Sequence, residues 1–273
     1  RKSFPVFVIL IFFETFSHVR SLLTDTLHGG KRGLDNIVIL AIDDESIQKI
    51  GRWPWDRDVF AQALESLNEA KAIGIDVSFF ERSENDEKLR KALESIPNVV
   101  LAAEVNKGTL YKPIFNTAFG YVNLPLDKDG VVRSVDARLY NDVQPFAFEI
   151  YEKAWNVKPS KDQDKYFINF PDPNTFQTFS FFEVLENDID FRDKIVLIGA
   201  TAPDLRDVHL VPTSSGKAIP GVEVHANIIQ NIILNNFLQQ QGKLSIIILV
   251  MIIGALGLFV LSRMNIFYSV IIV

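Results

Sequence analysis

The sequence predicts an α/β fold: a mostly parallel sheet flanked by helices, with a partly antiparallel edge, in an extracytoplasmic domain that has transmembrane helices at both ends. Three observations lead to this prediction. Apolar runs of strand length alternate with segments of helical periodicity, the strand runs are apolar throughout, and long uncharged stretches lie near both chain ends. With 48% hydrophobic and 23% charged residues, the 273-residue composition is globular rather than disordered.

The first stretch predicts a membrane anchor over residues 1–27. Arg1 and Lys2 precede the apolar residues 4–13, in which Pro5 is the one irregularity. This basic-then-apolar layout also occurs in cleaved signal peptides, but no small-x-small cleavage site follows it. We therefore expect an uncleaved transmembrane helix.

The region from 28 to 243 predicts the domain itself, beginning with a β-α-β unit. Two apolar strands flank a segment with apolar residues at helical spacing, and a second helix and a third strand follow. Two turn-rich strands form the expected antiparallel edge, and a further core strand ends at Gly199. In chain order, these elements cover residues 37–42, 59–67, 72–77, 87–96, 99–103, 131–140, 165–170 and 195–198.

The final helix of this region leads toward a second membrane span. It opens at Gly221, and Asn227, Asn231 and Asn235 mark its polar face. Residues 244–261 form an uncharged run that nearly spans a bilayer, and residues 266–273 predict the start of a further span.

The charges that flank these spans predict the topology. Arg1, Lys2 and Arg263 fall on one face, which the positive-inside tendency makes cytoplasmic. The lipid bilayer is then a partner, and the chain is a multi-pass protein of the cell (inner) membrane with residues 28–243 extracytoplasmic.

Composition and motifs exclude several classes of function. The net charge of −6 gives no basic surface for nucleic acid, and zero cysteines exclude thiol catalysis and Cys-ligated metals. There is no G-x-S-x-G, phosphate-loop or H-E-x-x-H motif. We therefore expect neither catalysis nor a cofactor in this segment.

Acidic residues follow two strands of the β-α-β unit, at the edge where open α/β sheets bind ligands. Asp43 and Asp44 follow the first strand, and Asp76 ends the second. Together with Glu45 they either ligate Mg²⁺ or Ca²⁺, the less favoured interpretation, or Asp44 or Glu45 caps the next turn while the others bond loop amides. The metal interpretation leads to one alternative function, a membrane-anchored metal-dependent hydrolase.

An aromatic and basic cluster lies in the loop that leads into the helix between these strands. Arg52, Trp53, Trp55 and Arg57 could stack on and pair with an anionic or aromatic ligand, or the indoles could pack a corner while Asp56 or Asp58 caps the helix. Thr201 lies in a small-residue turn that would let an oxyanion approach backbone amides. These positions, with the acidic residues, are the candidate site for an unknown extracytoplasmic ligand.

The helix before the second span predicts mechanical coupling. A rigid element from Gly221 through His225, Asn227 and Phe237 to residue 243 would carry motion into the bilayer. Because signalling across a bilayer by a few helices usually needs relative motion between protomers, we expect a homodimer. A structural or partner-binding ectodomain remains an alternative.

Several motifs in order resemble the type-2 CHASE domain, an extracellular sensor of bacterial transmembrane receptors. The resemblance covers about residues 30–238. It rests on IVILAIDDESIQKIGRWPWDRDVFAQAL, KAIGIDVSFF, DKDGVVRSV, DKIVLIGATAPDLRDVHLVPT and residues 219–234.

This resemblance implies a receptor whose parent protein is an enzyme. Its cytoplasmic output domain would be an adenylate or guanylate cyclase, or alternatively a histidine kinase or diguanylate cyclase. The resemblance assigns no ligand and no catalytic residue.

Overall fold

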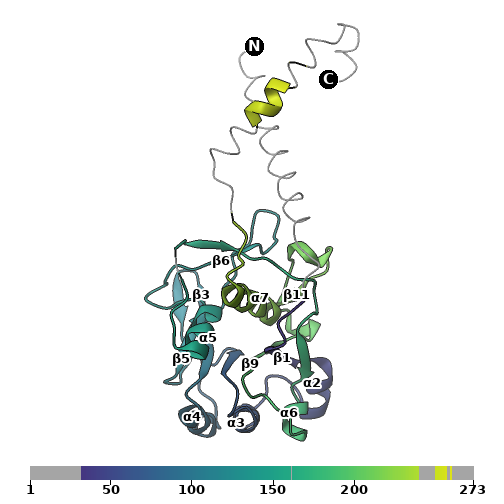
Figure 1. Ribbon diagram of the computed structural model, residues 1–273. Coiled ribbons are helices and arrows are strands. Elements are labelled where there is room, and N and C mark those ends of the chain that lie inside the picture. The colour runs from purple at the N-terminus through teal and green to yellow at the C-terminus, as the bar shows by residue number, and fades with distance from the viewer. Residues whose placement is uncertain (1–31, 161, 240–249, 257–258, 260–273) are drawn as a thin grey trace. The chain divides into compact units, whose positions relative to one another are not determined.

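The computed structural model describes residues 32–160, 162–239, 250–256 and 259. The chain divides into two compact units, Arg1–Phe237 and Leu238–Val273. The first unit contains a central sheet with helices on both faces (Figure 1). In the second unit, residues 250–256 are helical.

The central sheet has seven strands and is mostly parallel, as predicted. Its order is β4-β3-β2-β9-β1-β8, and β5 pairs with β3 beside β4. All pairings are parallel except the β3–β4 hairpin. The strands are β1 (Ile37–Ile42), β2 (Ala72–Asp76), β3 (Val99–Asn106), β4 (Thr109–Tyr111), β5 (Ala118–Tyr121), β8 (Gln177–Ser180) and β9 (Ile195–Ala200).

One face of the sheet is covered by four helices, which lie in the lower part of the domain in Figure 1. They are α2 (Asp44–Ile50), α3 (Arg57–Ser66), α4 (Asp86–Ser95) and α6 (Glu183–Glu186). Their apolar residues, such as Phe60, Leu64 and Leu89, pack on alternate strand residues such as Leu40 and Ile73. This first apolar cluster follows from strand alternation and helical periodicity.

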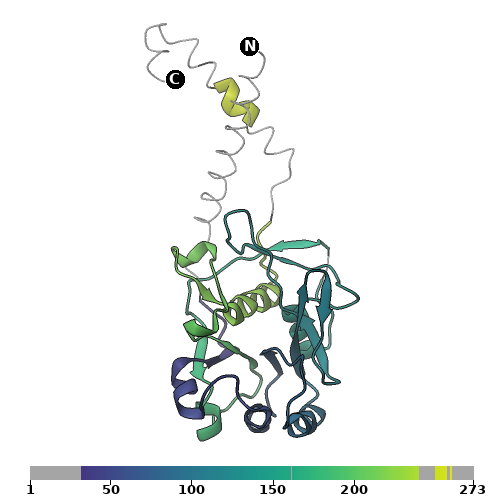
Figure 2. The ribbon, with the colours of Figure 1, turned by 180° about the vertical axis from the view of Figure 1, so that it is seen from behind.

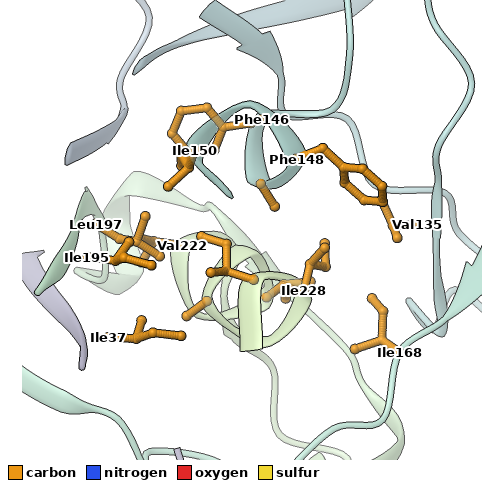
Figure 3. Close-up of a cluster of buried hydrophobic side chains, with 14 of the residues drawn as sticks. Ile37, Val135, Phe146, Phe148, Ile150, Ile168, Ile195, Leu197, Val222 and Ile228 are labelled. Atoms are coloured by element: carbon orange, nitrogen blue, oxygen red, sulfur yellow. The ribbon is translucent and has the colours of Figure 1, made fainter. Parts of the chain in front are cut away.

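The other face is covered by α5 (Phe146–Trp155) and α7 (Gly221–Leu234), and α7 crosses the domain above the sheet (Figure 2). Figure 3 shows side chains of α5 and α7 meeting those of β1 and β9 in a second apolar cluster. Helix α7 lies close to β9 because Gly199 has no side chain: a Cβ there would lie 2.6 Å from Cβ of Val222.

Most predicted elements are confirmed, including the strands at β1, β2, β3 and β9 and the helices α3 and α4. The strands predicted at 131–140 and 165–170 are shorter and lie outside the main sheet. They form an antiparallel pair, β6 (Ser134–Asp136) with β7 (Lys165–Phe167). A second small pair joins β10 (Val208–His209) to β11 (Ile219–Pro220).

Helix α7 ends earlier than predicted. Asn235 adopts a left-handed conformation with φ of 46°, its N–H bonds to the carbonyl of Ile232, and the N–H of Asn236 bonds to the carbonyl of Asn231. This is a Schellman cap, which satisfies the last carbonyls and ends a helix. The predicted continuous helix over 221–243 is therefore wrong, because α7 stops at Leu234.

The predicted membrane spans fall mainly on residues outside those described. This holds for residues 1–27 and 266–273, and for 244–261 apart from residues 250–256 and 259. Within the described ranges, no helix is both long and apolar enough to cross a membrane.

Candidate functional site: the carboxyl edge of the sheet and helix α7

Three predicted site residues lie at the same edge of the sheet. Asp43 follows β1, Asp76 ends β2 and Thr201 follows β9. Strand β9 separates β1 from β2, so the backbones of β1 and β2 lie two strand spacings apart, about 9.5 Å. Among the residues described, no group of three or more His, Cys, Asp or Glu could hold a metal ion. The carboxylates that the hydrolase alternative requires are therefore not assembled.

Asp43 and Asp44 belong to the start of α2. The Asp43 carboxylate accepts a hydrogen bond from the N–H of Ser46 at 2.8 Å and caps the helix, and it also accepts from the hydroxyl of Ser180. Asp44 is exposed in the first turn, where a negative charge favours the helix dipole. This geometry matches a capping role, although Asp43 makes the cap rather than Asp44 or Glu45.

The aromatic and basic cluster packs on the α3 side of the sheet. Trp55 is 5% exposed, and its ring lies edge-on to Trp53 at 5.2 Å and beside Phe181 at 5.0 Å. The indole N–H of Trp55 donates to the carbonyl of Gly51 at 2.8 Å.

The two arginines of this cluster differ in their surroundings. Arg57 lies over the ring of Phe79 at 4.5 Å and pairs with Asp86 at 3.4 Å, whereas Arg52 is exposed. Asp56 caps α3 by accepting from the N–H of Asp58. The corner-packing interpretation accounts for both tryptophans, and ligand binding by Arg52 and Arg57 stays a prediction.

Asp76 faces the other side of the sheet, toward α7. Its Oδ2 lies 3.8 Å from Nε2 of His225, and the two side chains are 11% and 4% exposed. Asp207, which precedes β10, lies over the first residue of α7: a Cβ on Gly221 would clash with the Asp207 carboxylate. His209 pairs with Asp207 at 3.3 Å. We call Asp76, His225, Asp207 and His209 the Asp–His cluster.

Burial governs the protonation of this cluster. Desolvation raises the pKa of Asp76 well above its usual value, and the nearby Asp207 carboxylate raises it further. Desolvation also lowers the pKa of His225 to about 4, an effect that Asp207 opposes and His209 reinforces. Burial therefore favours the protonated form of Asp76 and the neutral form of His225.

The polar side of α7 is buried, which sequence periodicity did not predict. Glu223, Asn227, Gln230 and Asn231 are 4%, 2%, 2% and 0% exposed, and we call them the polar ladder of α7. Of the predicted polar positions, Asn235 is exposed. Of the predicted coupling residues, Gly221, His225 and Asn227 lie within α7, and Phe237 lies beyond its end.

Side chains of the polar ladder hydrogen-bond to backbone groups of neighbouring segments, which those segments would otherwise pair with other backbone groups. Oδ1 of Asn231 accepts from the N–H of Asn169 at 2.7 Å, and its Nδ2 donates to the carbonyl of Asn169 at 3.2 Å. Gln230 accepts from the N–H of Leu34 at 2.8 Å and donates to the carbonyl of Arg32 at 3.5 Å. The Glu223 carboxylate accepts from the N–H of Asn174.

Sequence reasoning missed Asp207, Glu223 and Gln230 as members of these groups. One available signal was the spacing of Glu223, Asn227, Gln230 and Asn231, which places four polar residues on one side of a mostly apolar helix. No local signal brings Asp207 to Asp76, because strand β10 and helix α7 must first be placed against the sheet.

Two open clefts lie on the domain. Among the clefts lined by described residues, one of about 480 Å³ lies near the carboxyl ends of β3 and β5, and its walls include Tyr121, Asn123 and Arg138. The other, of about 430 Å³, includes Glu65, Asp188 and Arg192. Neither cleft is lined by a predicted site residue.

The fold defines an α/β domain whose mostly parallel sheet is covered by helices on both faces. A family model described as the CHASE2 domain matches residues 4–261. The chain therefore belongs to the CHASE2 domain family, whose members are extracellular sensor domains of membrane-bound signalling receptors. No curated protein and no solved structure matches the chain.

Proposed function

We propose that this chain is the sensory part of a multi-pass receptor in the cell membrane, with residues 28–243 outside the cytoplasm. A stimulus would displace α7, and the displacement would pass through the following segment into membrane spans. The controlled output would be a cytoplasmic adenylate or guanylate cyclase, or alternatively a histidine kinase or diguanylate cyclase.

The observation that carries this proposal is the attachment of both ends of the domain to α7. The incoming segment bonds to Gln230 through the backbone of Arg32 and Leu34. At the outgoing segment, the N–H of Asn236 donates to the carbonyl of Asn231, and the carbonyl of Asn236 accepts from the side chain of Asn169. A shift of α7 would therefore pull on both segments that lead out of the domain.

Packing supports the same role for the outgoing segment. The ring of Phe237 lies 4.9 Å from that of Tyr166, so the chain stays attached to the domain after α7 ends. The coupling we propose is therefore a clamped segment after a helix cap, in place of the uninterrupted helix expected from sequence.

The remaining parts of the proposal concern partners. We propose a homodimer, because relative motion between protomers offers a few membrane helices a way to transmit a signal. We propose Arg52, Arg57 and the acidic residues at the sheet edge as contacts for an extracytoplasmic ligand. Replacing Arg52 and Arg57 together should weaken the binding of an anionic ligand.

The experiment is an insertion in the full-length receptor. One residue inserted between Phe237 and Leu238 changes the register between the clamped segment and the chain beyond it. We expect altered cyclic nucleotide production in membranes, because the displacement of α7 would reach the chain beyond Phe237 in a different register.

A matched insertion between Gly216 and Lys217, in an exposed loop, is the control and should leave production unchanged. Equal production by both insertion variants and the unaltered receptor would favour the scaffold alternative over a sensor.

A further inference from the structure

The Asp–His cluster is a buried group of titratable side chains, of which the proposed function has used only Asp76. Its members come from four positions: the end of β2, the first half of α7, the residue before β10, and β10 itself. It lies where the first turns of α7 meet the carboxyl edge of the sheet. A change of charge here acts directly on the helix that we propose as the output element.

The geometry leaves His225 with unused hydrogen-bonding capacity. The residue is 4% exposed, and among the described residues its Nδ1 has no partner at good hydrogen-bond geometry, although the backbone of Val122 lies close enough to favour the charged ring. Its Nε2 lies 3.8 Å from Asp76, which is beyond hydrogen-bond length. A buried polar group without a partner is unfavourable, so the local arrangement is sensitive to any added or removed proton.

The groups facing His225 differ from side to side. Strand β2 presents Asp76, the segment before β10 presents Asp207, and β10 presents His209. Helix α5 presents the ring of Phe146, edge-on at 5.3 Å. Glu223 is the buried acid on α7 itself, and it lies about half a turn around the helix from His225, bonded to the backbone of Asn174.

We propose that the domain senses extracytoplasmic pH, and that loss of the Asp76 proton as pH rises displaces the first half of α7. The inference rests on the proposed function, in which α7 carries the signal. The proton goes to solvent water. The product has two carboxylates, Asp76 and Asp207, next to the start of α7.

Electrostatics gives the direction of the response. With Asp76 protonated, one carboxylate faces the start of α7. After deprotonation, two like charges face each other in a largely dry site, which disfavours the present packing. The raised pKa of Asp76 places this step above the pH at which an exposed aspartate loses its proton.

The test measures a distance in the full chain, reconstituted in lipid nanodiscs. Because the chain has no cysteine, Lys91→Cys on α4 and Leu234→Cys at the end of α7 supply a single pair of spin-label sites, and both positions are exposed. We expect the distance distribution from double electron–electron resonance to shift between about pH 5 and about pH 8. Asp76→Asn should hold the low-pH distribution throughout.

Two variants serve as matched controls. Glu45→Gln removes an exposed acid near the same sheet edge, and Glu223→Gln removes the buried acid of α7 but keeps an acceptor for Asn174. Both should retain the pH-dependent shift. A shift that survives in Asp76→Asn, or that is lost only in Glu223→Gln, overturns the assignment to Asp76.

A second measurement, nuclear magnetic resonance of the His225 ring, tests the proposal without any Asp76 variant, in case Asp76→Asn fails to fold. The ring signals of His225 in the unaltered chain, assigned by comparison with His225→Gln, should move as the neighbouring carboxyl loses its proton. Ring signals that stay constant over this range overturn the proposal. A distance between the spin labels that is the same at every pH, while the insertion after Phe237 still alters output, would overturn pH sensing and leave the proposed function in place.

Discussion

Asp76 and His225 prefer opposite protonation states, although they lie side by side. Burial holds the proton on Asp76 and keeps one off His225. Each residue therefore makes the stability of the domain depend on pH, and the two effects have opposite signs.

The first prediction concerns this pH dependence. The raised pKa of Asp76 means that stability falls as pH rises from about 4 toward that pKa, because the folded state keeps a proton that the unfolded state has lost. The lowered pKa of His225 means that stability falls as pH drops from 6.5 to about 4. Between about pH 4 and 6.5 the slope from His225 opposes the slope from Asp76, to which Glu223 adds because burial also raises its pKa, so denaturant unfolding should depend less on pH than His225 alone would make it.

The single variants separate the two slopes. Asp76→Asn should be stabilised by rising pH over this range, and His225→Gln should be destabilised, each by up to about 1.4 kcal/mol per pH unit. Identical profiles for the two variants would contradict the protonation states assigned here.

The second prediction concerns Asn231. Asn231→Leu leaves the buried N–H and carbonyl of Asn169 without their partner, and we expect a loss of roughly 2–4 kcal/mol in the free energy of unfolding. Gln62→Leu makes a comparable change on the exposed side of α3, and should alter stability by less than about 0.5 kcal/mol. Chemical denaturation measures both, and equal effects would show that the ladder adds no stability.

At the scale of elements, the contact between α7 and β9 depends on Gly199. The third prediction is that Gly199→Ala forces Val222 and α7 away from the sheet and costs about 1–3 kcal/mol, measured by thermal unfolding. Gly254→Ala is the control, because no atom of the residues that the structure describes lies within 4 Å of the Cβ that it adds. Unchanged stability in Gly199→Ala would mean that α7 can shift without loss.

Elements with strong local patterns were predictable from sequence. Strand β1 is apolar at every position, and α3 and α4 repeat apolar residues at helical spacing. The local sequence of each element is therefore enough to predict it. Strands β6 and β7 were detected, but their separation from the main sheet depends on distant contacts. The end of α7 is marked by Asn235, a residue type that tolerates the left-handed conformation, yet apolar residues beyond it suggested continuation.

The candidate site was only partly predictable, for a reason that lies in strand order. Asp43 and Asp76 were correctly placed at one edge, but β9, far away in sequence, inserts between their strands. Side-chain direction then puts Trp55 in the cluster beside α3, and Asp76 against α7. Neither fact can be read from the β-α-β segment alone.

At the scale of the whole molecule, the first unit contains two apolar clusters separated by the sheet. Both are built from residues between Ile37 and Ile229. The fourth prediction is that residues 32–239 fold without the flanking segments and unfold in one cooperative transition. Coincident loss of far-ultraviolet circular dichroism and tryptophan fluorescence would show this, whereas two separate transitions would indicate that the clusters are independent.

Gln230 and the carboxyl end of α7 together hold both segments by which the chain enters and leaves the domain. A domain whose ends are anchored to one helix can be inserted into a loop of a host protein without stretching the host chain. For the same reason the domain can be exchanged between receptors with junctions at residues 32 and 237. Its own contacts would fix the positions of both ends, so the recipient would need to match only the distance between them.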